Sequence, residues 1–242
     1  MSAYPLAIAE FGDGAVMVTV RDPDEAERRR LIGEFRERVL SELPPGVDDV
    51  VSGLESLLVE FDPLATTSEQ VSYALGALGR ADAVATARAT PAVLVVPIVV
   101  DEQTAPDLLD VAAELGLSPD EVVERLESST LTINLLAAAM APMMDGLDVP
   151  APVRRQATPR TDVPPGSVMI AGRNAIIQPF PGPTGWRVIG RSPLRIVDIA
   201  RESPVSFAPG DRIVFRRISE ADAVALQGGF LETSPRAEGG DR

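Results

Sequence analysis

Arginine is the residue type through which this sequence could bind an anion. Four arginines, Arg154, Arg155, Arg160 and Arg191, lie in or beside Pro- and Gly-containing loops. A planar guanidinium pairs bidentately with carboxylate or phosphate, so these residues could line an anionic substrate site. The competing interpretation is that they pair with Asp162, or with the acidic N-terminal half of the chain, and brace the protein. Residue types alone leave both interpretations open.

Ser167 and Trp186 are further candidate residues in the same stretch. Ser167 would need an activating base to act as a nucleophile, and the chain has no His to provide one. Residues 166–172 could offer backbone N–H groups to an anion, although the start of a strand is the favoured interpretation. Trp186 could form the floor of a pocket or fill a core, and the core is the favoured interpretation.

A Met-rich segment stands apart from these loops. Met140, Met143 and Met144 could form a soft partner interface, with a local core or hinge as the alternative. Nearby acids are the conceivable acid/base groups, with solvated loop positions as the default interpretation: Glu127, Asp145 and Asp148.

Composition excludes several chemistries. The chain has no Cys and no His, and its 22 basic residues are all Arg. A disulfide, a His-based catalytic triad, a Schiff-base Lys and a Walker lysine are therefore excluded within it, and we expect no metal site. Residues 1–150 carry 9 Arg and 27 acids, whereas residues 151–242 carry 13 Arg and 9 acids. The basic half lacks interleaved aromatics, so we expect no nucleic-acid partner.

The expected location follows from the apolar runs and the first residues. No apolar run approaches the roughly 18 residues that a membrane helix needs, and residues 1–11 lack a signal-peptide pattern. We therefore expect a cytoplasmic protein with no membrane partner.

Hydrophobic periodicity predicts an N-terminal α+β domain over residues 1–90. A first strand or hairpin is expected at 5–20 and further strands at 47–52 and 56–61. The helices are expected at 22–43 and 66–80, with Ser68 as an N-cap. Two helices on one face of an antiparallel sheet would give a small sandwich.

Residues 91–218 are predicted to form a second domain. A strong strand ends near residue 100, and two short helices form an insertion at about 105–128. Ser118 and Glu121 give the second helix a capping-box pattern. Short strands separated by Pro-Gly turns then predict an all-β unit. Residues 219–242 are expected to be a partly disordered tail.

Ordered motifs add a family resemblance. They include Ala-Pro-Asp-Leu (105–108), Thr-Pro-Arg-Thr-Asp-Val-Pro-Pro-Gly (158–166), Ile-Gly-Arg-Ser-Pro-Leu (189–194) and Pro-Gly-Asp-Arg-Ile-Val-Phe (209–215). Their order resembles the family of 5-oxoprolinase B subunits, formerly called allophanate hydrolase subunit 1, which includes KipI-type inhibitors of sporulation histidine kinases. The resemblance implies an α+β N-terminal domain followed by an all-β cyclophilin-like barrel.

The sequence departs from this family in one segment. The family has a His just after the helix that ends near Leu126, where this chain has Glu127 or Ser128. The family then carries Gly-Phe-x-Pro-Gly-Phe-x-Tyr, where residues 137–144 read Ala-Ala-Ala-Met-Ala-Pro-Met-Met. Only Pro142 matches the pattern.

The resemblance implies two alternative functions. The first is one component of a complex that hydrolyses 5-oxo-L-proline to L-glutamate with ATP, acting with a subunit-C-like (KipA-type) partner, with the A-type component as a further candidate. The chain alone is expected to bind no cofactor, and any ATP would be bound in the complex. The second is a non-catalytic KipI-like regulatory or scaffold module.

Overall fold

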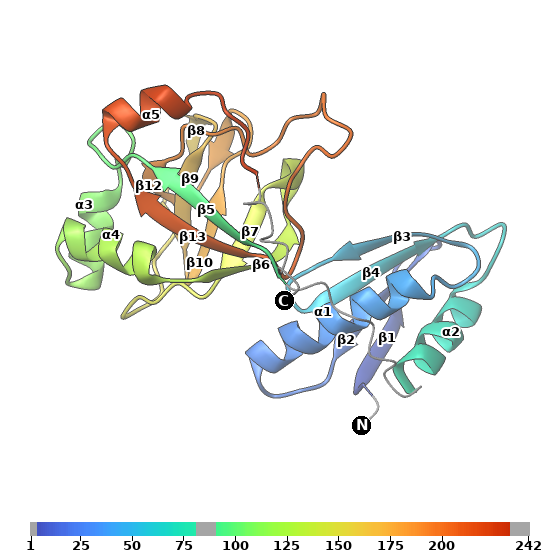
Figure 1. Cartoon of the computed structure of the whole chain (residues 1–242). Coiled ribbons are helices and arrows are strands. Elements are labelled where there is room, and N and C mark those ends of the chain that lie inside the picture. The colour runs from blue at the N-terminus through green and yellow to red at the C-terminus, as the bar shows by residue number, and fades with distance from the viewer. Residues whose placement is uncertain (1–3, 81–90, 233–242) are drawn as a thin grey trace, which may run out of the picture. The chain divides into compact units, whose positions relative to one another are not determined.

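The computed structural model describes residues 4–80 and 91–232. The chain divides into two compact units, Met1–Ala89 and Thr90–Arg242 (Figure 1). Each unit has its own hydrophobic core. No helix within the described residues is long and apolar enough to cross a membrane.

The first unit is a four-stranded antiparallel sheet with two helices on one face. The strands run in the order β1-β2-β4-β3. Their bounds are Leu6–Glu10 for β1, Ala15–Val20 for β2, Val47–Ser52 for β3 and Ser56–Phe61 for β4. The helices are α1 (Glu25–Ser41) and α2 (Ser68–Arg80). Alternate strand residues such as Val18 and Val59 pack with Phe35 and Leu75 of the helices in one cluster, as the two-residue period of a half-buried sheet requires.

The two helices of this unit begin at different kinds of cap. The Asp24 carboxylate accepts the N–H of Glu27 at 2.9 Å and caps α1. The prediction that Ser68 caps α2 is wrong. The Thr67 hydroxyl accepts the N–H of Gln70 at 3.3 Å, and the Ser68 hydroxyl instead donates to Glu10 at 2.6 Å.

The second unit is a seven-stranded sheet that curls into a nearly closed barrel. Its order is β12-β9-β10-β7-β6-β13-β5. The bounds are Val93–Ile98 for β5, Leu131–Leu136 for β6, Pro142–Asp145 for β7, Ser167–Ala171 for β9, Asn174–Ile177 for β10, Arg187–Arg191 for β12 and Arg212–Arg217 for β13. The two outermost strands meet at one bridge, where Val99 and Arg191 exchange backbone hydrogen bonds of 2.8 and 3.0 Å. The predicted fold class, α+β followed by a barrel, is confirmed.

Smaller elements surround this barrel (Figure 1). A two-stranded ribbon joins β8 (Arg160–Val163) and β11 (Gly182–Thr184). The predicted helical insertion is α3 (Leu108–Leu115) and α4 (Pro119–Ser128). The capping box at Ser118 is present, with the Ser118 hydroxyl and the Glu121 carboxylate each accepting the other residue's backbone N–H. Apolar residues of both helices join the barrel core.

Part of the predicted tail belongs to the second unit. Residues after β13 form α5 (Glu220–Leu226), and Phe230 makes a parallel bridge with Arg195. Leu231 is buried in the barrel core. Residues 233–242, which complete the predicted tail, lie outside the described residues.

Candidate functional site

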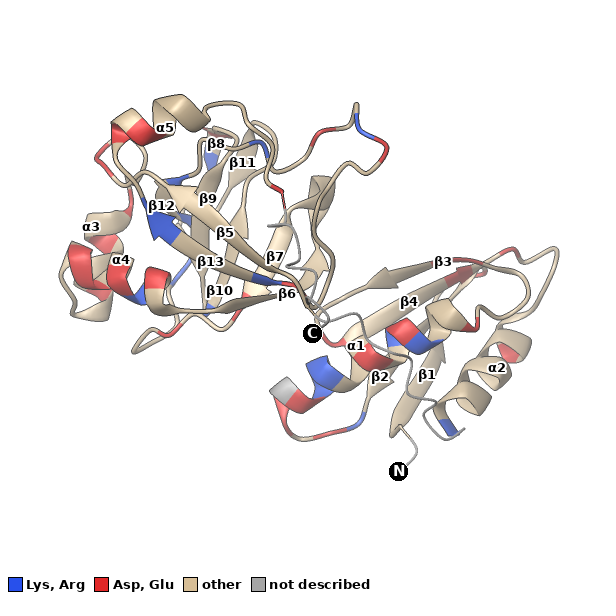
Figure 2. Ribbon diagram, in the orientation of Figure 1, with Lys and Arg blue, Asp and Glu red and all other residues tan. Residues whose placement is uncertain are grey.

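One face of α3 and the residue before it carry three carboxylates, and all three pair with arginines. The acids are Asp107, Asp110 and Glu114, whose spacing of three and seven residues places them on one side of a helix. Figure 2 shows the acidic colouring of α3. The three pairs are Asp107 with Arg160 at 2.5 Å, Asp110 with Arg187 at 3.8 Å and Glu114 with Arg154 at 3.2 Å. We call these six residues the α3 clamp.

Asp107 is the centre of the α3 clamp. It is 2% exposed, and its carboxylate accepts hydrogen bonds from the side chains of Arg160 at 2.5 Å and Gln156 at 2.8 Å. The same carboxylate accepts the backbone N–H of Val188 at 2.8 Å. A buried carboxylate is stable only when its oxygens are bonded in this way. The hydrogen bond to Asp107 raises the pKa of Arg160.

These contacts favour bracing over anion binding for two of the predicted arginines. Arg160 is held by Asp107 and Arg154 by Glu114, whose carboxylate also accepts the Arg154 backbone N–H at 2.8 Å. Both partners lie in the acidic half of the sequence, as the bracing interpretation expected, and neither is Asp162. Sequence reasoning did not identify Asp107 as a site residue, although it lies in the Ala-Pro-Asp-Leu motif.

Arg155 has a different environment. Its Cζ lies 5.7 Å from the ring centroid of Trp186, which is a cation–π contact. Among residues 4–80 and 91–232, no carboxylate lies within ion-pair distance of Arg155. Trp186 packs against Val163, Met169 and Val188, a cluster separate from the barrel core. Trp186 therefore packs against this smaller hydrophobic cluster and does not join the larger core of the barrel.

Arg191 lies at the closure of the barrel. Its backbone pairs with Val99, and its positive charge acts on Asp101. The pKa of Asp101 is lowered, first by the backbone N–H of Thr104 and then by that of Gln103, with a smaller contribution from Arg191. Within the described part of the chain, no hydrogen bond or ion pair joins Arg191 to the α3 clamp or to Arg155. The four predicted arginines therefore do not form one interacting cluster.

The loop before β9 does not offer an anion cradle. The Gly166 N–H donates to the carbonyl of Gln178 at 2.7 Å, and the Ser167 N–H donates to that of Pro164 at 3.3 Å. The Ser167 side chain is buried at the first position of β9. The backbone N–H groups are thus engaged within the protein, and the expectation that Ser167 is no nucleophile fits its burial.

Residues 137–141 form a strained turn between β6 and β7. Ala139 and Met140 have φ values of 56° and 62°, in the left-handed region that residues with a Cβ avoid. Two consecutive residues with a Cβ therefore hold a backbone conformation that glycine adopts without strain.

The Met-rich segment does not present one continuous surface. Met144 is fully buried in the barrel core, so the prediction that it contributes to a partner interface is wrong. Strand alternation turns Met143 to the opposite face, and Met140 is 41% exposed in the turn.

The three candidate acids are dispersed among separate contacts. Glu127 accepts the backbone N–H of Arg217 at 2.8 Å, and Asp148 pairs with Arg125 at 3.4 Å. Asp145 lies on β7 opposite Thr132. No group of three potential metal ligands occurs in the described residues.

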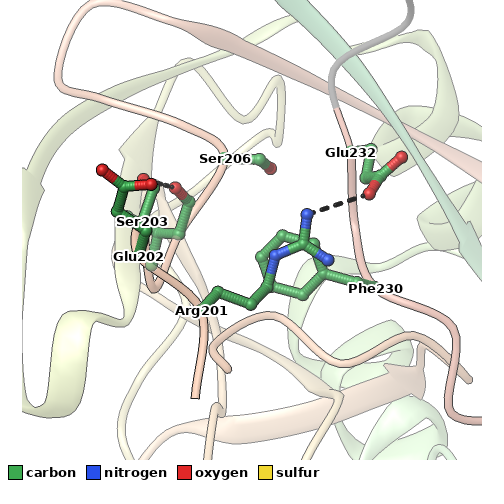
Figure 3. A pocket seen from close by; sticks show the side chains of 7 residues that line it. Arg201, Glu202, Ser203, Ser206, Phe230 and Glu232 are labelled. Carbon is green, nitrogen blue, oxygen red and sulfur yellow. Dashed lines mark hydrogen bonds and ion pairs between the residues drawn. The ribbon is translucent and has the colours of Figure 1, made fainter. Parts of the chain in front are cut away.

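A surface cavity of about 380 Å³ is lined by none of the predicted site residues (Figure 3). The Arg201 guanidinium stacks 4.2 Å from the Phe230 ring centroid and pairs with Glu232 at 3.2 Å. The remaining lining residues are Glu202, Ser203, Val205 and Ser206. Because the Arg201 guanidinium already forms an ion pair with Glu232, this cavity is a weaker candidate for an anion site than the surface at Arg155.

Comparison with known proteins defines the class to which this fold belongs. Residues 6–207 match the family described as carboxyltransferase domain, subdomain C and D, and the chain belongs to that family. It is 25% identical over 230 residues to the 5-oxoprolinase B subunit of Bacillus subtilis, covering 89% of this chain and 94% of that protein. It is 36% identical over 121 residues to the protein of the same name from Escherichia coli O157:H7, and the match covers 50% of this chain and 56% of that protein. The chain is a divergent member of the family of 5-oxoprolinase B subunits.

Solved structures share the fold. TTHA0988 matches with a TM-score of 0.69 and 28% identity over 86% of this chain, which spans only 40% of that longer protein. A conserved uncharacterized protein of Pyrococcus horikoshii matches at 28% identity and a TM-score of 0.53, covering 90% of this chain and all of that one. The Kluyveromyces lactis urea amidolyase matches with a TM-score of 0.74 and 16% identity. The match covers 96% of this chain and 16% of the amidolyase, and at this identity it shows likeness of fold alone.

Proposed function

We propose that this chain is the B-type component of a multi-subunit, cytoplasmic 5-oxoprolinase-type complex. The observation that carries the proposal is the match to three 5-oxoprolinase B subunits, two of them over most of the chain. The complex would hydrolyse 5-oxo-L-proline to L-glutamate with ATP. The partner would be a subunit-C-like protein, with the A-type protein as a further component.

In this proposal the chain contributes a scaffold and a binding surface rather than a complete active site. It has no Lys, no His and no Cys, so it cannot supply a P-loop lysine, a His base or a thiol nucleophile. Its candidate acids are engaged in separate contacts. ATP would therefore be bound elsewhere in the complex.

A specific observation supports the second candidate, a KipI-like regulatory or scaffold module. The turn at Ala139 and Met140 has a left-handed backbone, and the chain lacks the glycines and aromatic side chains of the signature that the family resemblance implies. The absence of those side chains is what a module that only binds its partners would show.

Co-expression separates the two candidates. The chain is produced with the C-type and A-type proteins of its own host, and ATP hydrolysis dependent on 5-oxo-L-proline is measured for the complex and for the chain alone. We expect turnover only in the complex. A stable complex without turnover would favour the KipI-like module. Turnover by the chain alone would show that the chain carries a complete active site and would contradict both candidates.

A further inference from the structure

Arg155 is held in place by the residues on either side of it. The preceding residue, Arg154, donates its backbone N–H to Glu114 at 2.8 Å. The following residue, Gln156, donates its backbone N–H to Gly185 at 2.7 Å and its side-chain amide to Asp107 at 2.8 Å. The backbone of Arg155 is therefore fixed before any partner binds.

The surface beneath Arg155 is equally ordered. Trp186 donates its backbone N–H to the Thr184 hydroxyl at 3.1 Å, and its ring packs on Val163, Met169 and Val188. The Arg155 guanidinium lies over this fixed indole at 5.7 Å from the ring centroid, so the contact favours one orientation and lowers the entropy lost when the guanidinium binds an anion.

Within the described residues, the arginines near Arg155 are paired with carboxylates, whereas Arg155 is not. Its neighbours Arg154, Arg160 and Arg187 each pair with a carboxylate of the α3 clamp. No acidic side chain in the described ranges pairs with Arg155. One oriented, uncompensated guanidinium remains at the surface.

We infer that Arg155, whose guanidinium lies over Trp186, is a docking contact of this chain and receives a carboxylate side chain of the subunit-C-like partner. Arg and Trp are the residue types most enriched among the few contacts that dominate protein interfaces. The inference rests on the proposed assembly and assigns one of its contacts to named residues.

A protein partner fits this geometry better than a free small anion. Arg155 is exposed, and a single exposed ion pair contributes little binding energy by itself. A partner protein can bury the guanidinium and the indole together, which strengthens the same pair by removing water.

The central experiment compares two neighbouring arginines in the full-length chain. Binding to the purified C-type protein of the same host is measured by isothermal titration calorimetry for wild type, Arg155→Gln, Arg155→Lys and Arg154→Gln. We expect Arg155→Gln to raise the Kd at least about tenfold and Arg155→Lys to raise it less, because Lys keeps the charge but not the planar fork. Arg154→Gln, which removes an already paired guanidinium, should stay within about threefold.

A second measurement uses the isolated chain. Trp186 is its only tryptophan, so its fluorescence reports on this contact directly. Hexaglutamate peptide should shift the Trp186 emission of wild type and of Arg154→Gln, and the shift should be absent in Arg155→Gln and weakened by salt.

Each outcome decides between the inference and the proposed function. Equal Kd values for Arg155→Gln and Arg154→Gln would overturn the inference while leaving the assembly intact. A wild-type chain that binds no C-type protein would overturn both. An emission shift from inorganic phosphate equal to that from hexaglutamate would replace the docking contact with a small-anion site.

Discussion

Asp107 binds both backbone groups of Val188. The Asp107 N–H donates to the Val188 carbonyl at 3.1 Å, and the Val188 N–H donates to the Asp107 carboxylate at 2.8 Å. Val188 lies in β12, the outermost strand of the sheet on that side, so its outer edge has no neighbouring strand there. One aspartate thus satisfies the backbone groups of an unpaired strand edge beside the Val99–Arg191 bridge that closes the barrel.

This relationship predicts that Asp107→Ala destabilises the second unit by about 3 kcal/mol, because it leaves a buried backbone N–H and two side-chain donors without an acceptor. The measurement is urea unfolding followed by Trp186 emission, which reports on this unit. The matched control is Asp110→Ala on the same helix face. Asp110 is 75% exposed and 3.8 Å from Arg187, so its removal should cost less than about 0.5 kcal/mol. Equal effects of the two variants would show that Asp107 has no special structural role.

Gly166 predicts a second large effect. Its φ is 82°, and a Cβ added there would lie 2.2 Å from the backbone oxygen of Ser192. Gly166→Ala therefore combines backbone strain with a clash, and we expect a loss of about 3 kcal/mol or a failure to fold. Gly116→Ala is the control, because Gly116 has a φ of 67° but open space around its Cβ, so strain alone should cost about 1 kcal/mol. Urea midpoints of the two variants test this, and a Gly166→Ala protein as stable as Gly116→Ala would contradict the clash.

The sequence predicted features that depend on local spacing. The capping box of Ser118 and Glu121 is an example, because both partners lie within one helical turn. The α3 clamp could not be predicted in this way, since Asp107 meets Arg160 53 residues later in the chain. Met144 was misplaced because which face of a strand points inward depends on a register that one sequence does not reveal.

Asp101 predicts a pH dependence of stability. The N–H groups of Thr104 and Gln103 hold its pKa below the ordinary value of 3.8. A carboxyl whose pKa is lower in the folded state contributes stability above its unfolded pKa, and that stability is lost as pH falls through the folded value. Asp101→Asn should therefore reduce the loss of unfolding free energy between about pH 4 and about pH 2. Urea unfolding at each pH measures this, and a variant whose stability falls as steeply as that of wild type would contradict the assignment.

Ala139 gives a prediction in which substitution should stabilise the protein. A residue with a Cβ in the left-handed region loses about 1–2 kcal/mol, and glycine loses part of that gain through its greater freedom in the unfolded chain. Ala139→Gly should therefore raise the unfolding free energy of the second unit by about 0.5–1 kcal/mol, whereas Ala138→Gly, at a neighbour without a positive φ, should lower it. Unfolding followed by Trp186 emission compares them. If both variants destabilise the protein equally, the left-handed backbone at Ala139 carries no measurable strain. If only Ala139→Gly stabilises it, the turn between β6 and β7 holds Ala139 in a conformation that a Cβ disfavours.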